Sequence, residues 1–307
     1  MKNQGWTLIG PQKGMGQVKA WIIGARPHTW SATFVPISVG VSLAAQEGAK
    51  IDWIIAFFTL LSALLIQIGA NLTNDALDFK KGVDTEGRVG FQRMTQAGWM
   101  PQRDVLVGGF ICFALAFVCG IPLIMLGGWP FLFVLLSSIT FAYLYTGGPF
   151  PLSYHGLAEV FTLLFFGLVS TTTAYYLQMG AVHKSVVIAG LQVGLLASVI
   201  IAINNLRDIE NDAKQNKRTL AVRFGMIFAR IEITCFTFLP FILGFYWSYF
   251  GYPLATLLPY LVLPLSYQNV KAIWNIKPSI AYNRFLARSA LIQLLFGIFL
   301  ILGYVLS

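Results

Sequence analysis

The sequence predicts an all-α, polytopic membrane protein. Of its 307 residues, 57% are apolar and only 11% are charged, whereas soluble domains carry roughly 25% charged residues. Several apolar stretches reach the ~20 residues that a helix needs to cross a bilayer. These stretches are apolar throughout and do not alternate with polar residues, which argues against membrane-spanning strands.

We expect about nine membrane-spanning helices, joined by connectors that alternate between short and long. The expected spans are residues 27–46, 53–73, 104–124, 129–146, 156–179, 185–206, 228–249, 252–272 and 288–306. The two long polar connectors are residues 74–103 and 207–227. Residues 1–25 read as a polar, glycine-rich lead without a secretory signal. Residues 26–307 are expected to form a single intramembrane domain.

The distribution of basic residues predicts the orientation in the membrane. Lysine and arginine concentrate in the lead, in both long connectors and after the eighth span, whereas the opposite side carries only Lys50 and Lys184. By the positive-inside rule, the N-terminus and both long connectors are cytoplasmic. The net charge of +9 is therefore interpreted as loop charge that sets the topology, and not as a nucleic-acid surface. The three cysteines show no disulfide or zinc spacing.

Two acidic clusters stand out because each follows an apolar run. In the first, Asp75 and Asp78 share a helix face with Asn71. In the second, Asp208 and Asp212 are four residues apart, and an asparagine precedes them by one turn. The two segments hold seven of the chain's twelve acidic residues: Asp75, Asp78, Asp84, Glu86, Asp208, Glu210 and Asp212. One such cluster alone is readily explained by charges paired at the lipid boundary, but two matched clusters on one side indicate a common site.

The residue types in the two clusters suit a magnesium ion and a diphosphate. Paired carboxylates supply the hard oxygen ligands that Mg²⁺ prefers, together with substrate phosphate oxygens. Neighbouring asparagines can ligate as neutral oxygens or orient the carboxylates. The expected metal-binding set is Asn71, Asn74, Asp75, Asp78, Asp84, Asn204, Asp208 and Asp212. Interleaved cations suit a polyanionic substrate, and the set expected to hold diphosphate is Lys81, Arg88, Arg93, Arg207 and Lys217.

Two further residues carry weaker signals. Glu159 falls inside the fifth span, where a carboxylate serves either a function or a paired structural role. Tyr145, near the end of the fourth span, suits either the wall of a site or the aromatic belt at the membrane interface.

These clusters resemble the two signatures of the UbiA family of intramembrane aromatic prenyltransferases. Asn74-Asp75-x-x-Asp78 followed by Asp84 is similar to the first signature, and Asp208-x-x-x-Asp212 led by Asn204-Asn205-x-Arg207 is similar to the second. Residues 79–88, 145–152 and 205–222, together with Arg26-Pro27, resemble the branch that prenylates 1,4-dihydroxy-2-naphthoate in menaquinone synthesis.

The resemblance implies nine helices around a central cavity that opens to the cytoplasmic face and to lipid. It implies Mg²⁺-dependent transfer of a polyprenyl group from polyprenyl diphosphate to an aromatic quinone precursor. In the resembled branch the acceptor then loses CO₂, which gives demethylmenaquinone. The expected catalytic set is Asp75, Asp78, Asp208 and Asp212, and Arg26 and Tyr145 are expected at the aromatic acceptor.

Two alternatives remain open at this point. The first is the same chemistry on another acceptor, namely 4-hydroxybenzoate, another quinone precursor, a heme or a chlorin. The second is a membrane transporter, which would be expected to carry ionisable groups near the bilayer midplane. The clusters of this chain lie at helix ends on one side, which counts against a transporter.

Overall fold

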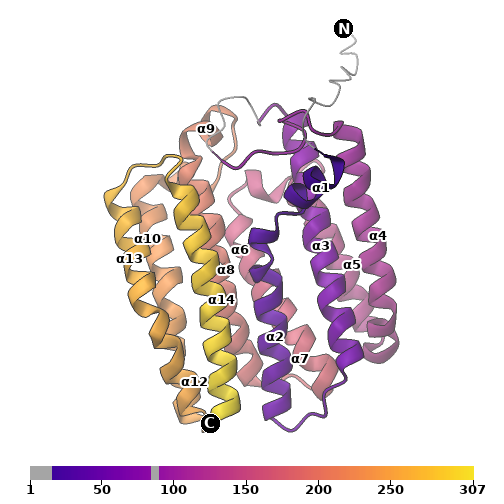
Figure 1. Ribbon diagram of the computed structural model, residues 1–307, viewed down its shortest axis with the longest axis vertical. Helices are drawn as coiled ribbons and strands as arrows, with labels where there is room; N and C mark the ends of the chain where they lie inside the picture. Colours follow the sequence, from indigo (N-terminus) through magenta and orange to yellow (C-terminus); the bar gives the residue numbers. More distant parts are fainter. Residues whose placement is uncertain (1–15, 84–89) are drawn as a thin grey trace, which may run out of the picture.

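The computed structural model describes residues 16–83 and 90–307, and in these residues all regular secondary structure is helical. The long helices run side by side as a bundle (Figure 1), and short helices and loops cover the end near α1 and α9. The elements are α1 (Gln17–Ala25), η1 (Pro27–Thr29), α2 (Ser31–Gln46), α3 (Trp53–Lys80), α4 (Gln102–Gly127), α5 (Trp129–Leu144), η2 (Leu152–Tyr154), α6 (Ala158–Thr162), η3 (Leu163–Val169), α7 (Ser170–Met179), α8 (Lys184–Arg207), α9 (Ile209–Lys214), α10 (Leu220–Leu243), α11 (Phe245–Tyr249), α12 (Pro253–Leu257), η4 (Leu258–Val262), α13 (Leu263–Asn275) and α14 (Tyr282–Leu306).

Every expected span falls on helical structure, which confirms the all-α prediction. Six helices among the described residues are long and apolar enough to cross a membrane, and α2 and α5 are shorter apolar helices. The expected span at residues 252–272 falls on three consecutive pieces, α12, η4 and α13. The number of nine crossings therefore stays a prediction.

The outer surface of the bundle is apolar, as a lipid-facing surface must be. Large side chains such as those of Phe110, Val118, Met125 and Trp129 are about half exposed or more on α4 and α5. Scattered exposed apolar residues are normal on soluble proteins, but here they cover whole helices whose hydropathy fits a bilayer. The chain is an integral membrane protein.

Helix α8 is the centre of the bundle. Among the six long helices it is the most enclosed, since 72% of its most apolar stretch is buried. Glycines let the fifth span approach it closely: a Cβ on Gly194 would lie 2.7 Å from the Cα of Gly167, and one on Gly167 would lie 2.7 Å from the Gly190 carbonyl oxygen. Gly167 belongs to η3, a π-helical stretch within that span. The close contact holds η3 against α8, and near the end of α8 Asn205 donates to Glu159 at the start of α6.

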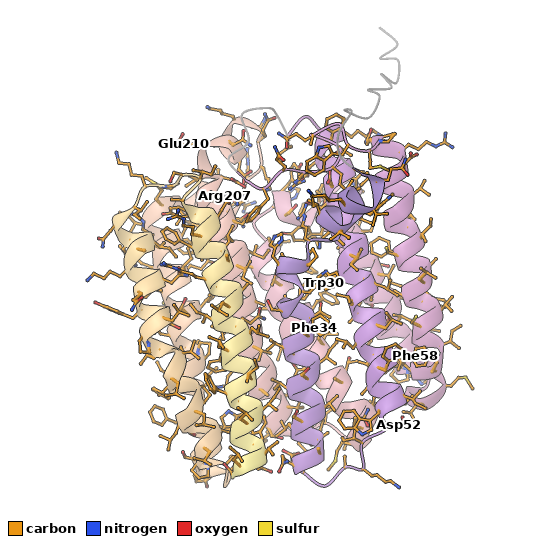
Figure 2. All side chains as sticks on the ribbon, in the orientation of Figure 1. Trp30, Phe34, Asp52, Phe58, Arg207 and Glu210 are labelled. Carbon is orange, nitrogen blue, oxygen red and sulfur yellow. The ribbon has the colours of Figure 1, made fainter. Side chains whose placement is uncertain are left out.

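The first cluster lies on a helix that runs past its expected span end, and the second lies at the end of α8 and in α9. Helix α3 continues to Lys80, so Asp75 and Asp78 are helical, and α8 continues to Arg207. Figure 2 shows Arg207 and Glu210 at one end of the bundle and Asp52, which caps the start of α3, toward the other. In α10, Gly225 adopts a φ of 84°, which separates a short first stretch near the site from the rest of that helix. Asp84 and Arg88, expected at the site, lie outside the described residues.

Candidate active site at the head of the bundle

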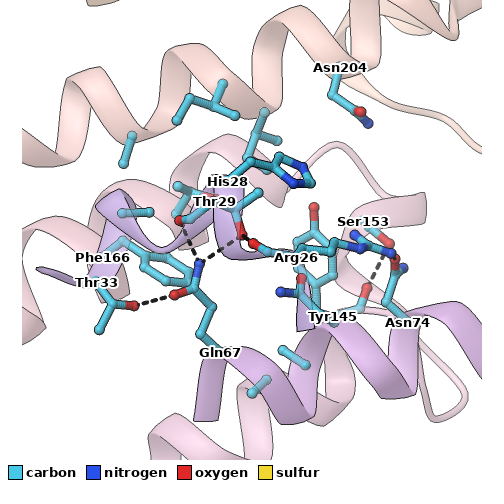
Figure 3. A pocket seen from close by; sticks show the side chains of 18 of the residues that line it. Arg26, His28, Thr29, Thr33, Gln67, Asn74, Tyr145, Ser153, Phe166 and Asn204 are labelled. Atoms are coloured by element: carbon cyan, nitrogen blue, oxygen red, sulfur yellow. Dashed lines mark hydrogen bonds between the residues drawn. The ribbon is translucent and has the colours of Figure 1, made fainter. Parts of the chain in front are cut away.

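A cavity of about 740 Å³ lies between η1, α2, α3, α5, η3, α8 and α14. Its deeper wall is made mostly of small and aromatic side chains, including Ala63, Phe141, Phe165, Ala197 and Ala290. Its other end is polar and is lined by Arg26, Asn74, Tyr145 and Asn204 (Figure 3). The cavity thus joins an apolar interior to the residues of both sequence clusters.

Asp78 is a buried carboxylate of the first cluster that is surrounded by side-chain donors. It is 2% exposed, and three side chains from three segments donate to it. Arg93 Nη1 and Asn74 Nδ2 each lie 2.9 Å from Asp78 Oδ2, and the Tyr154 hydroxyl lies 2.9 Å from Oδ1. A buried carboxylate needs such partners, because burial without them is costly. Asp78 therefore fixes the position of the cation and the hydroxyl that surround it.

Asp75 points to a different set of partners. Its carboxylate accepts from the backbone N–H groups of Met94 at 2.8 Å and Thr95 at 3.2 Å, and also from the Thr95 hydroxyl. It does not contribute to the wall of the cavity, whereas Asp78 and Arg93 do. Asp75 thereby holds the turn that carries Arg93 toward Asp78. Two aspartates three residues apart thus have separate surroundings, a distinction that helical spacing did not reveal.

The end of α1 is fastened to the first cluster. Arg26 adopts a left-handed conformation with a φ of 52° at the end of α1. Its Nη2 donates to Asn74 Oδ1 at 3.2 Å, and Asn71 Nδ2 donates to the Ala25 carbonyl at 3.3 Å. Both asparagines and Arg26 line the cavity. Figure 3 shows the Arg26 side chain extended toward Asn74, close to Tyr145 and Ser153.

Arg207 organises the second cluster. It is 4% exposed and donates two hydrogen bonds to Asp208, from Nη2 to Oδ2 at 2.6 Å and from Nε to Oδ1 at 2.8 Å. The same guanidinium donates to Asn204 Oδ1 and to Asn283 Oδ1, each at 2.7 Å. A two-point contact of this kind between an arginine and a carboxylate fixes the relative orientation of the two side chains and also stabilises the pair. Asn283 belongs to α14, so Arg207 also ties the cluster to the last helix.

Asp212 lies in α9, outside the spanning helices, and is paired with Lys217. Lys217 Nζ lies 3.3 Å from Asp212 Oδ2. Burial raises the pKa of Asp212 to about 6, and the negative charges of Asp208 and Asp78 add to that rise, while Lys217 opposes it. Asn216, at a φ of 54°, makes the tight turn that brings Lys217 back to Asp212.

Tyr154 joins the two clusters. Its hydroxyl donates to Asp78, and its carbonyl accepts from the Arg218 backbone N–H at 3.0 Å. Lys81 Nζ lies 4.4 Å from the centre of its ring, and Lys217 Nζ lies 5.9 Å away. Lys81 also donates to the Thr146 carbonyl, and burial lowers the pKa of its ammonium group. The sequence reasoning missed Tyr154, although it lies two residues beyond the 145–152 segment that carried part of the resemblance.

Most of the expected site residues gather around one cavity. Those that line it are Arg26, Asn71, Asn74, Asp78, Arg93, Tyr145, Asn204, Arg207 and Lys217. Four described residues stand behind the wall: Asp75, Lys81, Asp208 and Asp212. Among the described residues, no three His, Cys, Asp or Glu side chains approach closely enough to hold a metal by themselves. This does not conflict with Mg²⁺, which commonly uses one or two carboxylates and completes its shell with phosphate oxygens and water.

Comparison with known proteins decides the family. The UbiA prenyltransferase family matches residues 33–289 of this chain. The chain belongs to this family. A 1,4-dihydroxy-2-naphthoate octaprenyltransferase of Haemophilus influenzae is 30% identical over 300 residues, which cover 94% of this chain and 96% of that protein. The protein of the same name from Escherichia coli is 34% identical over 230 residues, covering 73% of this chain and 74% of the relative.

Solved structures of the family share the fold of this chain. A UbiA homologue from Archaeoglobus fulgidus bound to GPP and Mg²⁺ superposes with a TM-score of 0.63 at 17% identity, covering 93% of this chain and 99% of that chain. An apo UbiA homologue from Aeropyrum pernix gives a TM-score of 0.63 at 14% identity, with 91% and 97% covered. Family membership and the named relatives make this chain an enzyme that transfers prenyl groups to an aromatic acceptor.

Replacing Tyr154 with phenylalanine tests the link between the clusters. We expect Tyr154→Phe to lower kcat/KM for the prenyl diphosphate by roughly 10- to 100-fold, because a hydrogen bond to a buried carboxylate is worth about 1.5–3 kcal/mol. Steady-state kinetics of the purified protein in nanodiscs would measure this. Tyr249→Phe, whose ring is 86% exposed, is the matched control and is expected to behave as the native chain. A native value of kcat/KM for Tyr154→Phe would contradict the linking role.

Proposed function

We propose that this enzyme transfers a polyprenyl group from polyprenyl diphosphate to 1,4-dihydroxy-2-naphthoate. The observation that carries the proposal is the single cavity whose polar end has residues of both clusters and whose deeper wall is apolar. The names of the relatives from Haemophilus influenzae and Escherichia coli support the choice of acceptor. A cavity of this form suits a substrate with a diphosphate at one end and a hydrocarbon chain at the other.

The polar end of the cavity supplies both signs of charge that a metal diphosphate requires. Arg93, Arg207 and Lys217 line it as cations, with Lys81 close behind. We assign the diphosphate to these groups and to Arg88. We assign metal binding to Asp78, Asp208 and Asp212 with Asn71, Asn74, Asn204 and Asp84, whose oxygens are hard donors. Mg²⁺, when bound there, would neutralise the charge that develops on the departing diphosphate.

The residues would act by binding, orientation and charge. The bond between the allylic carbon and the diphosphate oxygen breaks, and the diphosphate leaves with the electron pair. Arg93, Arg207 and Lys217 stabilise that negative charge, which is electrostatic catalysis. The electron-rich naphthoate ring then forms the new carbon–carbon bond to the allylic cation, and its carboxylate is released as CO₂. Arg26 and Tyr145 are proposed to hold the acceptor, since both line the cavity beside Asn74.

The location of the site at one end of the bundle fits the two substrates. Taking a polyprenyl chain out of lipid costs about 0.8 kcal/mol per CH₂, whereas the diphosphate and the naphthoate are polar. We propose that this end faces the cytoplasm, because the basic residues concentrate on that side, and that the membrane is the cytoplasmic one. We treat residues 26–307 as one catalytic domain and residues 1–25 as its lead, whose Ala20 packs on Leu72 and Ala76.

The proposal is tested with purified full-length protein in nanodiscs. Polyprenyl diphosphate is supplied with either 1,4-dihydroxy-2-naphthoate or 4-hydroxybenzoate, with Mg²⁺ or with EDTA, and mass spectrometry follows the product. We expect a prenylated, decarboxylated product from the naphthoate that disappears with EDTA. Product formed only from 4-hydroxybenzoate would mean that the enzyme carries out the same prenyl transfer on a different acceptor. No product from either acceptor, with several prenyl lengths, would refute the proposal.

Substituting each of the two helical aspartates of the first cluster should have a different effect on turnover and stability. Asp78→Asn is expected to lower turnover by at least about 1,000-fold, because it removes a metal oxygen and the ion-pair partner of Arg93. Asp75→Asn, which disturbs the turn before Arg93, is expected to lower thermal stability and turnover together. Turnover and the midpoint of thermal unfolding in detergent are measured for both. A stable Asp75→Asn protein that fails to bind Mn²⁺ would make Asp75 a direct metal ligand.

Metal binding should weaken in mild acid because of Asp212. Its pKa of about 6 means that the carboxyl is largely ionised at pH 7.5 and largely protonated at pH 5. A proton must then leave before the oxygen can bind a cation, so affinity falls as pH falls. We expect about tenfold weaker Mn²⁺ binding at pH 5 than at pH 7.5, measured by electron paramagnetic resonance. Asp212→Asn is the control and should lose most of this change, and a native chain with pH-independent binding would contradict the assignment.

A further inference from the structure

Glu159 stands directly behind the cavity wall without lining it. It lies at the start of α6 and is 2% exposed. Asn205 Nδ2 donates to Glu159 Oε1 at 2.7 Å, and Asn205 itself lines the cavity. Ser198, two turns earlier on α8, donates to the Glu159 backbone carbonyl at 3.1 Å. A carboxylate on one helix is thereby held against an amide on the central helix of the bundle.

The second oxygen of this carboxylate has no hydrogen-bond partner. Glu159 Oε2 is buried, and no group in the described part of the chain donates to it. Burying an unsatisfied oxygen costs stability, and a native protein rarely keeps one without a use. An apolar residue at this position would fill the same space without that cost. The arrangement therefore points to a role for the bond between Glu159 and Asn205 beyond packing.

The bond fixes which atom of the Asn205 amide is available to the cavity. An asparagine side chain offers an NH₂ donor and a carbonyl acceptor. Since Nδ2 donates one of its two N–H groups to Glu159, the amide is held with Nδ2 toward Glu159 and Oδ1 on the opposite side, where it can accept from a ligand. Glu159 is acceptor-only when ionised, so it enforces this orientation. Without Glu159 the amide could turn and offer either atom.

A negative charge on Glu159 disfavours a polyanion in direct contact with Asn205. Asn205 and Tyr145 both line the cavity, and Glu159 stands behind Asn205. An amide oxygen backed by a carboxylate repels phosphate oxygens but accepts readily from a hydroxyl group. This wall therefore suits a ligand that donates hydrogen bonds.

We propose that Glu159 is a positioning residue that turns the Asn205 carbonyl oxygen toward a phenolic hydroxyl of the aromatic acceptor. The inference rests on the proposed function and deepens it by naming a contact of the acceptor. Glu159 acts through Asn205 and does not touch the substrate. The ring hydroxyl is recognised as a donor, which favours the hydroquinone form of the acceptor over a quinone or a methyl ether.

The test is steady-state kinetics of the full chain in nanodiscs with polyprenyl diphosphate and 1,4-dihydroxy-2-naphthoate. We expect Glu159→Ala to raise the KM of the naphthoate about tenfold, in line with the loss of one hydrogen bond, while the KM of the diphosphate stays within about twofold. Glu159→Gln keeps an oxygen for Asn205 Nδ2 and is expected to restore most of the affinity. Asn205→Ala, which leaves the carboxylate in place, should reproduce the effect if Glu159→Ala does not fold.

A double mutant and a matched control separate positioning from packing. Glu159→Ala combined with Asn205→Ala should raise the naphthoate KM no further than either single change, because both remove the same contact. Gln192→Leu is the control: Gln192 is fully buried on α8 and bonded to Trp247 and the Pro240 carbonyl, away from the cavity. It should lower the unfolding temperature without changing the ratio of the two KM values.

Each outcome has a distinct meaning. An unchanged naphthoate KM in the Glu159 and Asn205 variants of an active enzyme would overturn this inference and leave the proposed function standing. Equal increases in both KM values would assign the pair to structure alone and would also overturn it. Native protein that does not prenylate the naphthoate at all would overturn the proposed function, and the inference with it.

Discussion

The buried carboxylate of Asp78 is the constraint on which the head of the bundle depends. A charge of this kind, enclosed by apolar helices, is stable only with close donors. Asp78 obtains them from α3 itself, from the turn that carries Arg93 and from the loop that carries Tyr154. Those segments are far apart in sequence. The carboxylate thus determines where the connecting segments lie, and their positions give the cavity its polar end.

The same principle accounts for the state of the cations. Arg93 is paired with Asp78, Arg207 with Asp208 and Lys217 with Asp212. Binding a metal diphosphate on the proposed function would be an exchange of partners, in which carboxylates turn to the metal and cations turn to phosphate. Such an exchange keeps every charge compensated before and after binding, which matters because an unpaired charge at a buried site is costly. This exchange of partners also explains why basic and acidic residues occur together in the two connectors.

Much of this architecture could be predicted from the sequence, because long apolar runs leave few alternatives to membrane helices. The grouping of Asn74, Asp78, Arg93, Asn204 and Arg207 at one cavity followed from the positive-inside rule and helical spacing. The separate surroundings of Asp75 and Asp78 could not be predicted in this way. Their three-residue spacing places them on one side of a helix, but the loop at Met94 and Thr95 decides which of them faces the cavity. Tyr154 was missed for a similar reason, since its partners Asp78 and Arg218 are remote in sequence and only tertiary structure brings them together.

The central claim is that the two clusters form one site around a single diphosphate. An experimental structure of the protein in nanodiscs with Mn²⁺ and an unreactive prenyl thiodiphosphate tests it most directly. The account predicts diphosphate density between the first cluster and the second, in contact with Arg93 and Arg207, with the prenyl chain along the apolar wall near Phe141 and Ala197. Diphosphate bound at one cluster alone, with the carboxylates of the other still paired to their own cations, would contradict it.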